Sequence, residues 1–374
     1  MLKVLTIVGT RPEIIRLSCI IKKLDVFFDH KIAHTGQNYD FELNKIFFDE
    51  FKIRKPNFFL NCIGTSATEK IGDIISKTDK VIRTFKPDAV LILGDTNSSL
   101  SAIAAKKNKI PIFHIEAGNR CYDQRVPEEI NRKIVDHISD INLTYSDISR
   151  ENLLRENFSS FQVIKVGSPL KEVISFNKKK IYNSKILSNL KLKKENYFVI
   201  SVHREENIDN SENFKKIINI INSLADKFKL KIIFSVHPRT KKQIKNKKIK
   251  LNKLVKISKP LGFFDYIKLQ INSKVVISDS GSITEESSIL NFPALNIRET
   301  HERQEGMEEA SVIMTGLSFK NVIHGIKILK NQKRGLKRNI NIVSDYDKEN
   351  VSEKVVRIIL SYTDYVNKSI WKKF

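Results

Sequence analysis

The fold is set by the opening stretch LKVLTIVGTRPE, residues 2–13. Residues 2–8 form an apolar, β-branched run that is typical of a buried strand. Gly9 then permits a tight turn, and Pro12 suits the first position of a helix. A secretory signal would need a small-residue cleavage site where Arg11 and Glu13 stand. We therefore predict a strand, a turn and a helix, with Arg11 beside a helix N-terminus that favours anions.

The same alternation of strand and helix continues along the chain. Further strands of the first half are predicted at 31–35, 89–93, 111–115, 141–144 and 162–166, with helices at 13–24, 68–85 and 98–106. A second series has strands near 198–202, 231–236, 254–257, 275–278 and 294–297, with helices at 212–227, 264–270, 283–290 and 320–329. Such alternation indicates parallel sheets covered by helices, so the fold class is α/β.

The length of 374 residues suits two domains better than one. The alternation pauses over the Lys/Asn-rich segment 178–195, which we interpret as the linker region. We predict Rossmann-like domains at 1–170 and 171–350. An amphipathic helix at 351–365, within the C-terminal segment 351–374, would pack back across the cleft. Open α/β sheets bind ligands where loops leave the carboxyl ends of their strands, so we expect the active site in the cleft between the domains.

The formal charge of +24, from 66 Lys and Arg against 42 Asp and Glu, raises the question of nucleic-acid binding. Lysines crowd residues 178–180, 191–194 and 241–250, without the interleaved aromatic residues of a stacking platform. This favours a solvated surface over a polyanion or membrane-surface role, and we expect no nucleic-acid partner.

The three cysteines, Cys19, Cys62 and Cys121, are odd in number and lack metal-ligand spacing. We therefore expect neither a disulfide framework nor a metal site, and a reducing compartment such as the cytoplasm. Apolar runs stay below the roughly 18 residues that span a bilayer, so we expect no integral membrane segment.

Polar clusters of the first half follow its strands: LGDTN at 93–97, HIEAGNR at 114–120 and PEEINR at 127–132. Asp95 and Glu116 end strands and Glu128 opens a helix, so these carboxylates, with Arg120 and Arg132, could converge on one cavity. Paired acids whose environments separate their pKa values supply one base and one acid. The structural alternatives are an N-cap at Asp95, salt-bridged scaffold residues elsewhere, and a turn in which Arg11 meets only Glu13 or water.

The second half carries two histidines at equivalent strand exits, His203 and His237. A single histidine is usually structural, but two in such positions suggest proton transfer or phosphate contact. The segment SDSGSITEE, residues 278–286, is a small-residue loop that runs into a helix. We predict an anion cradle from the amides of Ser280, Gly281 and Ser282, with Glu286 placed to hold ribose hydroxyls. The chain lacks a P-loop and a Gly-x-Gly-x-x-Gly motif, which argues against NTP hydrolysis and NAD.

These motifs, in this order and continuing to Glu302 and Arg303, resemble the non-hydrolysing UDP-N-acetylglucosamine 2-epimerase family nearly from end to end. The resemblance implies a glycosyltransferase-B type pair of Rossmann-like domains, usually in a homodimer, that acts on a UDP-activated N-acetylhexosamine without a cofactor. It also implies a mechanism: removal of the C2 proton, anti elimination of UDP to a glycal, and readdition of UDP with the proton returned to the other face.

The resemblance assigns roles by position. The acid–base candidates are Asp95, Glu116, Glu128 and His203, and Asp95 or Glu116 is the favoured base. The other expected contacts are Arg11, His203, His237, Ser280, Gly281 and Ser282 to the diphosphate, Glu286 to the ribose, and Arg132 and Arg303 to the sugar.

Within the family, the chain is most similar to the enzymes that form UDP-N-acetyl-L-fucosamine from UDP-2-acetamido-2,6-dideoxy-L-talose. The segments concerned are HTGQNYD at 34–40, GNRCYDQR at 118–125, KVGSP at 165–169 and HERQEGM at 301–307. This implies a part in capsule or O-antigen synthesis.

Two departures from the family pattern bear on this. Gln37-Asn38-Tyr39 stands where UDP-GlcNAc-specific bacterial enzymes carry Gln-His-Arg, which helps to bind an activating second UDP-GlcNAc, so we do not expect such activation. Gln304 replaces a common Pro, which changes the loop after Arg303.

Four alternatives stay open. A UDP-GlcNAc/UDP-ManNAc 2-epimerase differs only in its sugar, and a hydrolysing relative differs in letting water intercept the glycal. A glycosyltransferase of the same fold would need an acceptor and would not exchange the C2 hydrogen. A nucleic-acid-binding protein would show steep salt dependence of binding and no turnover of nucleotide sugars.

Overall fold

The opening stretch forms a strand, a turn and a helix, as predicted: β1 covers Lys3–Val8 and α1 covers Arg11–Phe27. The structure is a computed structural model that describes residues 1–36, 41–236, 238–259 and 261–373. It divides into two units. The first comprises residues 1–176 and 345–374, and the second comprises residues 177–344. The first unit thus extends past the expected boundary at 170, and it also includes the C-terminal segment from Asp345 onward.

The described residues of the first unit build a seven-stranded parallel sheet in the order β3-β2-β1-β4-β5-β6-β7. Its strands after β1 are β2 (Asp29–His34), β3 (Phe58–Phe59), β4 (Ala89–Leu93), β5 (Ile112–Ala117), β6 (Ile141–Thr144) and β7 (Val163–Lys165). The pairing of β1 with β4, in register Val4 to Ala89, is the point where the strand order reverses. Loops that follow β1 and β4 are therefore neighbours.

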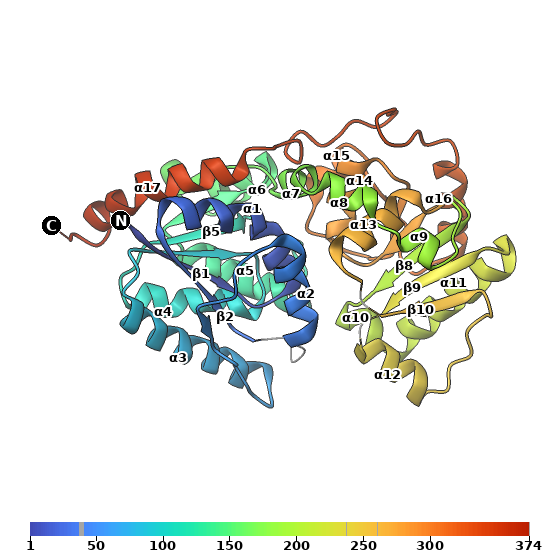
Figure 1. The fold of residues 1–374 in the computed structure, drawn as a ribbon, viewed down its shortest axis with the longest axis horizontal. Helices are drawn as coiled ribbons and strands as arrows, with labels where there is room; N and C mark the ends of the chain where they lie inside the picture. The colour runs from blue at the N-terminus through green and yellow to red at the C-terminus, as the bar shows by residue number, and fades with distance from the viewer. Residues whose placement is uncertain (37–40, 237, 260, 374) are drawn as a thin grey trace. The chain divides into compact units, whose positions relative to one another are not determined.

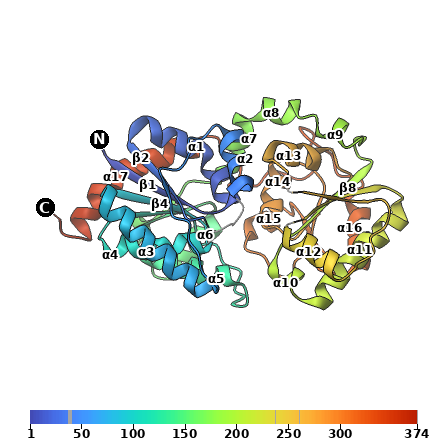
Figure 2. The same cartoon turned by 60° about the horizontal axis from the view of Figure 1, so that its bottom comes forward.

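Helices cover both faces of this sheet. They are α2 (Phe41–Phe51), α3 (Ala67–Phe85), α4 (Ala102–Lys107), α5 (Pro127–Ile138), α6 (Asp147–Arg155), α7 (Leu170–Phe176) and α17 (Val351–Ser369), with short 3₁₀ helices η1 (Asn97–Ser101) and η2 (Ser160–Gln162). Figures 1 and 2 show α3 and α4 on one face and α1 with α17 on the other. The predicted helix at 98–106 is a 3₁₀ turn followed by α4, because its serines compete for backbone hydrogen bonds.

The second unit, in its described part, repeats the plan with a six-stranded parallel sheet in the order β10-β9-β8-β11-β12-β13. The strands are β8 (Tyr197–Val202), β9 (Lys231–Val236), β10 (Val255–Ser258), β11 (Val276–Ser278), β12 (Ala294–Asn296) and β13 (Ile313–Met314). The helices are α8 (Lys178–Asn183), α9 (Ile186–Asn189), α10 (Glu205–Ile208), α11 (Ser211–Phe228), α12 (Pro238–Asn246), α13 (Phe263–Asn272), α14 (Ser282–Leu290), α15 (Gln304–Glu308) and α16 (Phe319–Leu329).

Strand β8 shows why the strand sequences of these sheets are continuously apolar. Phe198 and Ile200 pack into the core beneath α11, whereas Tyr197 and Val199 pack into the core on the α13 side. Both faces of a parallel sheet are covered by helices, so successive side chains are buried on alternate faces. The sequence predicted this strand and the other long ones to within a few residues, but it missed the two-residue edge strands β3 and β13.

The segment 178–195 is not the plain linker that its polarity suggested. It contains α8 and α9, which belong to the second unit, because Ile181 and Ile186 are buried there. Two apolar side chains among lysines and asparagines are enough to dock such a segment on a core.

The C-terminal helix belongs to the first unit, although the second unit precedes it in the chain. Helix α17 packs on α1 (Figure 1). Lys23 of α1 pairs with Glu353 of α17 at 2.9 Å. Val355 and Ile359 are fully buried on its inner side. The helix therefore ties the C-terminal segment to the N-terminal sheet. In the described parts of the chain, no helix is both long and apolar enough to cross a membrane.

Packing of α17 is expected to contribute strongly to stability. Replacing buried Ile359 by Ala should lower the free energy of unfolding by about 2–5 kcal/mol, because it leaves a cavity beneath the helix. The matched control, Leu360→Ala, removes a side chain that is 63% exposed and should change the free energy by no more than about 0.5 kcal/mol. Urea denaturation followed by circular dichroism measures both, and equal effects would contradict the packing of α17.

Candidate active site

Glu13 joins two loops at the carboxyl edge of the first sheet. Its Oε2 accepts hydrogen bonds from the amides of Gly9 and Thr10 at 2.6 and 3.2 Å. Its Oε1 accepts from the hydroxyls of Thr10 and Thr96 at 2.9 and 2.7 Å. The turn after β1 and the turn after β4 are thus held by one buried carboxylate.

Burial raises the pKa of Glu13 to about 7, and the donors from Thr96, Gly9 and Thr10 lower it only in part. Glu13 had no predicted role in the site. Its signal was the spacing Thr10-x-x-Glu13, which is a capping box at the start of α1.

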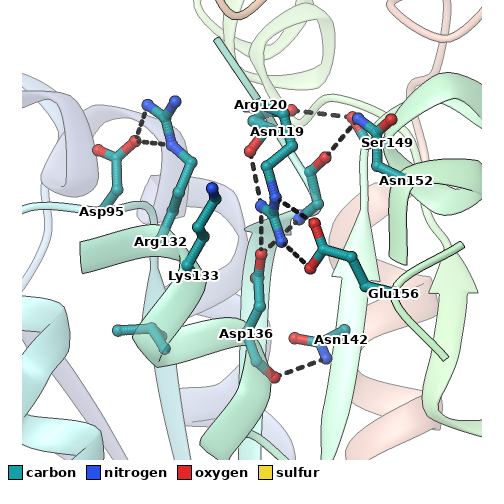
Figure 3. A network of polar contacts seen from close by, with 12 residues as sticks. Asp95, Asn119, Arg120, Arg132, Lys133, Asp136, Asn142, Ser149, Asn152 and Glu156 are labelled. Carbon is teal, nitrogen blue, oxygen red and sulfur yellow. Dashed lines mark hydrogen bonds and ion pairs between the residues drawn. The ribbon is translucent and has the colours of Figure 1, made fainter. Parts of the chain in front are cut away.

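Asp95 lies two residues past the end of β4 and faces Arg132 of α5. The guanidinium donates to Asp95 Oδ2 at 2.5 and 3.0 Å (Figure 3). It also donates to the buried Glu129 at 2.6 Å. Asn131 donates to the backbone carbonyl of Asp95 at 3.0 Å. Asp95 and Arg132 are therefore brought together, and the carboxylate keeps 22% of its surface exposed.

Glu116 sits at an irregularity in β5. Its φ is +71°, and the register with β6 shifts between Ile115 and Ala117. Left-handed backbone is uncommon for a residue with a side chain, and such outliers cluster at functional sites. The carboxylate lies 4.0 Å from the guanidinium of Arg16. Arg16 was not singled out by the sequence, because nothing in its spacing marks it.

Arg120 does not join these carboxylates in a cavity, as the sequence had suggested. Its buried guanidinium donates to Asp136 at 2.7 Å and to both oxygens of Glu156 at 2.7 Å (Figure 3). Burial alone would lower the pKa of Arg120, but Glu156 and Asp136 raise it above its ordinary value. Arg120 and its two carboxylate partners are a scaffold element, since an unsatisfied charge at such a site would be strongly destabilising.

The same scaffold reaches the loop that carries Asp95. His114 Nδ1 lies 2.9 Å from Asp136, and His114 Nε2 donates to the carbonyl of Gly94 at 2.9 Å. The backbone immediately before Asp95 is thereby supported from beneath.

The other two predicted residues of the first unit, Glu128 and Arg11, each lie at the start of a helix. Glu128 opens α5 and is half-buried, whereas its neighbour Glu129 is fully buried and also accepts from the amide of Cys121 at 3.1 Å. Arg11 is exposed at the start of α1, with its guanidinium 5.8 Å from the centre of the Phe47 ring.

Asp279 follows β11 in the second unit, as Asp95 follows β4 in the first. It accepts from the amides of His203 and Arg204 at 3.1 Å and from the side chain of Asn207 at 3.1 Å. His203 Nδ1 also lies 3.1 Å from it. Burial alone would raise the pKa of Asp279, but His203 and Asn207 hold it below its usual value. His203 is thus oriented by Asp279, a residue with no predicted role of its own.

The predicted anion cradle lies at the start of α14, but the amides of Ser280 and Ser282 already have partners. The amide of Ser280 donates to the Ser278 hydroxyl at 3.1 Å, and that of Ser282 donates to the Ser280 hydroxyl at 3.4 Å. Gly281 lies close to Glu302: a Cβ at this position would lie 2.3 Å from a carboxylate oxygen, so the Glu302 side chain would have to shift. A phosphate at this helix start would therefore exchange with serine hydroxyls.

Two further predicted residues are engaged within the second unit. Glu286 accepts from Gln270 at 2.6 Å, in a buried contact. Arg303 is buried 3.5 Å from Glu285 and 4.0 Å from Glu305. His237 lies outside the described residues.

Comparison with known proteins agrees with this architecture. The family model described as UDP-N-acetylglucosamine 2-epimerase matches residues 22–360. The UDP-N-acetylglucosamine 2-epimerase of Methanocaldococcus jannaschii is 36% identical over 97% of this chain and 100% of its own.

Solved structures extend the likeness to the fold. A structure of UDP-N-acetylglucosamine 2-epimerase from Rickettsia bellii has 47% identity and a TM-score of 0.93, with both chains fully covered. The Methanocaldococcus jannaschii UDP-GlcNAc 2-epimerase in complex with UDP-GlcNAc and UDP has 35% identity and a TM-score of 0.89, over 96% of this chain and 100% of its own.

These matches confirm the predicted α/β class with two Rossmann-like units of glycosyltransferase-B type. The family model spans most of the chain, and the relatives are aligned over almost their full length. The chain belongs to the UDP-N-acetylglucosamine 2-epimerase family, whose members are isomerases.

Proposed function

We propose that this protein inverts C2 of a UDP-activated N-acetylhexosamine. The observation that carries the proposal is the pair of carboxylates at the carboxyl edge of the first sheet. Asp95 is oriented by Arg132, and Glu116 has a left-handed backbone near the end of the neighbouring strand β5. Inversion needs a proton taken from one face of C2 and returned to the other, so two acid–base groups at one site suit the reaction.

The chemistry proceeds by elimination and readdition. A carboxylate, Asp95 or Glu116, takes the C2 proton; the released electron pair forms the C1–C2 double bond of a glycal; and the C1–O bond breaks, with its electrons leaving on UDP. UDP then adds back to C1 while a proton is delivered to the opposite face of C2. Glu128 and His203 are the further acid–base candidates. The C2 proton is weakly acidic, so the departing diphosphate needs strong charge stabilisation.

The second unit would supply that stabilisation. His203, fixed through Asp279, and the start of α14 at Ser280, Gly281 and Ser282 are proposed to contact the diphosphate. A phosphate would replace the serine hydroxyls as acceptor for these amides and gain from the helix dipole. Arg11 and His237 are proposed as further phosphate contacts, Glu286 as the ribose contact, and Arg132 and Arg303 as sugar contacts.

The finer proposal concerns the sugar. The resemblance of segments 118–125 and 301–307 supports conversion of UDP-2-acetamido-2,6-dideoxy-L-talose to UDP-N-acetyl-L-fucosamine, for capsule or O-antigen synthesis. A second candidate is epimerisation of UDP-GlcNAc to UDP-ManNAc, which is supported by the names of the relatives from Methanocaldococcus jannaschii and Rickettsia bellii. Arg120, which belongs to segment 118–125, is buried in an ion pair with Asp136. This structural role weakens the support that segment 118–125 gives to the L-fucosamine proposal.

The proposal extends to a homodimer in the cytoplasm that needs no cofactor. Its support is the family resemblance and the three cysteines, which are all free. Sedimentation velocity of the purified protein tests the homodimer directly.

Incubation in deuterated water tests the reaction and the sugar together. Purified protein is given each of the two UDP sugars separately, and the products are followed by proton NMR. We expect deuterium at C2 of UDP-N-acetyl-L-fucosamine, because the proton returned to the glycal comes from groups that exchange with solvent. Turnover of UDP-GlcNAc alone would keep the reaction and overturn the finer proposal, while absence of C2 exchange with both sugars would contradict the proposed function.

Asp95→Asn tests the acid–base role. Turnover should fall by about 10²–10⁴-fold, since an amide cannot accept the proton. UDP affinity, measured by calorimetry, should stay near the wild-type value. Asp79→Asn is the matched control, because Asp79 lies on α3 in a surface pair with Arg83 and should leave turnover unchanged. Wild-type activity of Asp95→Asn would remove Asp95 from the site.

A further inference from the structure

Glu13 is a buried carboxylate that the proposed reaction does not use as acid or base. It is the point at which the turn after β1 meets the turn after β4. Thr96, which donates to it at 2.7 Å, is the residue directly after Asp95. The same Thr96 hydroxyl accepts from the amide of Ser98 at 3.2 Å and so fixes the start of η1. Glu13 therefore holds the side chain of the residue next to Asp95.

The geometry points to Glu13 as a positioning residue, whose ionised carboxylate pins the Thr96 turn to the Gly9–Thr10 turn and thereby holds Asp95 in its pairing with Arg132. This inference rests on the proposed function and adds to it a residue that controls the geometry of the base.

The donors around Glu13 explain why its ionised form matters. Two backbone amides point at Oε2, and an amide cannot reverse its direction, so a proton on Oε2 would face two donors. Two hydroxyls point at Oε1 and can rotate. A proton on Oε1 would reverse the Thr96 bond, so that Glu13 donates to a hydroxyl that still accepts from the Ser98 amide, and the charge-assisted bonds to Glu13 would become weaker neutral ones. Protonation thus loosens the turn that carries Asp95.

Burial, and not a neighbouring charge, brings the pKa of Glu13 toward neutrality, and the charged groups around it have contacts of their own. Burial raises the pKa of Glu13 to about 7. On its own helix, Arg11 lies at the Phe47 ring and Arg16 faces Glu116. On the facing turn, Asp95 is paired with Arg132. At the end of the neighbouring strand β2, burial lowers the pKa of His34 to about 4, so that ring is neutral in the working range.

A second capping box in the first unit provides a comparison. Glu69 at the start of α3 accepts from the amide and hydroxyl of Thr65 at 2.7 and 2.6 Å, but this contact is exposed and stays within one helix start. Glu13 differs from Glu69 in being buried and in receiving a donor from a distant loop. Glu69→Gln is therefore the matched control for Glu13→Gln.

The test is the pH dependence of kcat and KM between pH 5.5 and 9, on whichever UDP sugar the wild-type protein epimerises. For the wild type, kcat should fall as the pH drops through about 7, because Glu13 takes up a proton. Glu13→Gln should lower kcat at least tenfold with little change in KM, and this limb of the profile should disappear. Thr96→Val should also lower kcat, Thr96→Ser should restore it, and Glu69→Gln should keep the wild-type profile.

Two results would overturn the inference. One is Glu13→Gln with a wild-type kcat and profile. The other is a variant of low activity that keeps the limb near pH 7, because the titrating group would then be another residue. Should Glu13→Gln fail to fold, the comparison of Thr96→Val with Thr96→Ser decides the matter, and equal activities of these two variants would contradict the role of the Thr96 hydroxyl.

Thermal unfolding provides a readout that does not depend on activity. The pKa of Glu13 is raised from an ordinary value of 4.5 to about 7, so the folded protein binds the extra proton between these values. Stability from this group is therefore present below pH 4.5 and is lost as the pH rises through about 7. The Tm of Glu13→Gln relative to wild type should rise across this interval, whereas that of Glu69→Gln should not. If this Tm difference rises with pH in a protein that turns over neither sugar, the titration of the buried carboxylate is supported and the proposed function is rejected. If the Tm difference does not change with pH, the titration of Glu13 is rejected.

Discussion

Each sheet has one buried carboxylate at its strand-order reversal, and that carboxylate organises the polar cluster of its own unit. In the first unit, Glu13 gathers donors from the turns after β1 and β4. In the second unit, Asp279 gathers donors from the loop after β8 and so fixes His203. Both carboxylates accept hydrogen bonds from backbone amides in turns at the carboxyl ends of parallel strands. Such amides need an acceptor when they are buried. The two carboxylates are held in opposite ways, since burial raises the pKa of Glu13 while the partners of Asp279 lower its pKa.

Beneath this edge, the first unit carries a buried charge network. Asp136 connects Arg120 with His114, and His114 reaches the carbonyl before Asp95. Buried ion pairs of this kind add little net stability, because the desolvation of the charges offsets their attraction. Their value here is geometric. They hold the backbone around Asp95 rigid from below, while Arg132 orients its carboxylate from the side.

The sequence found most of these parts but not their relations. Asp95 and Arg132 were each assigned to the site from their positions, and the structure pairs them. Arg120 looked equivalent to Arg132 in the sequence, yet its side chain is fully buried and contacts Asp136 and Glu156. Spacing along a chain cannot separate these cases, because it says which residues leave a strand together and not which of them faces solvent.

What the sequence determined by itself was the α/β class, the long strands and helices, the two-unit plan and the family. These follow from apolar periodicity and from ordered motifs, which are local properties of the chain. Only the tertiary structure decided that α17 packs on α1, that 178–195 docks through Ile181 and Ile186, and that Glu13 reaches Thr96. The physical reason is that burial and pairing depend on residues distant in the sequence. A carboxylate acquires its partners and its altered pKa only when the sheet has brought the loops together.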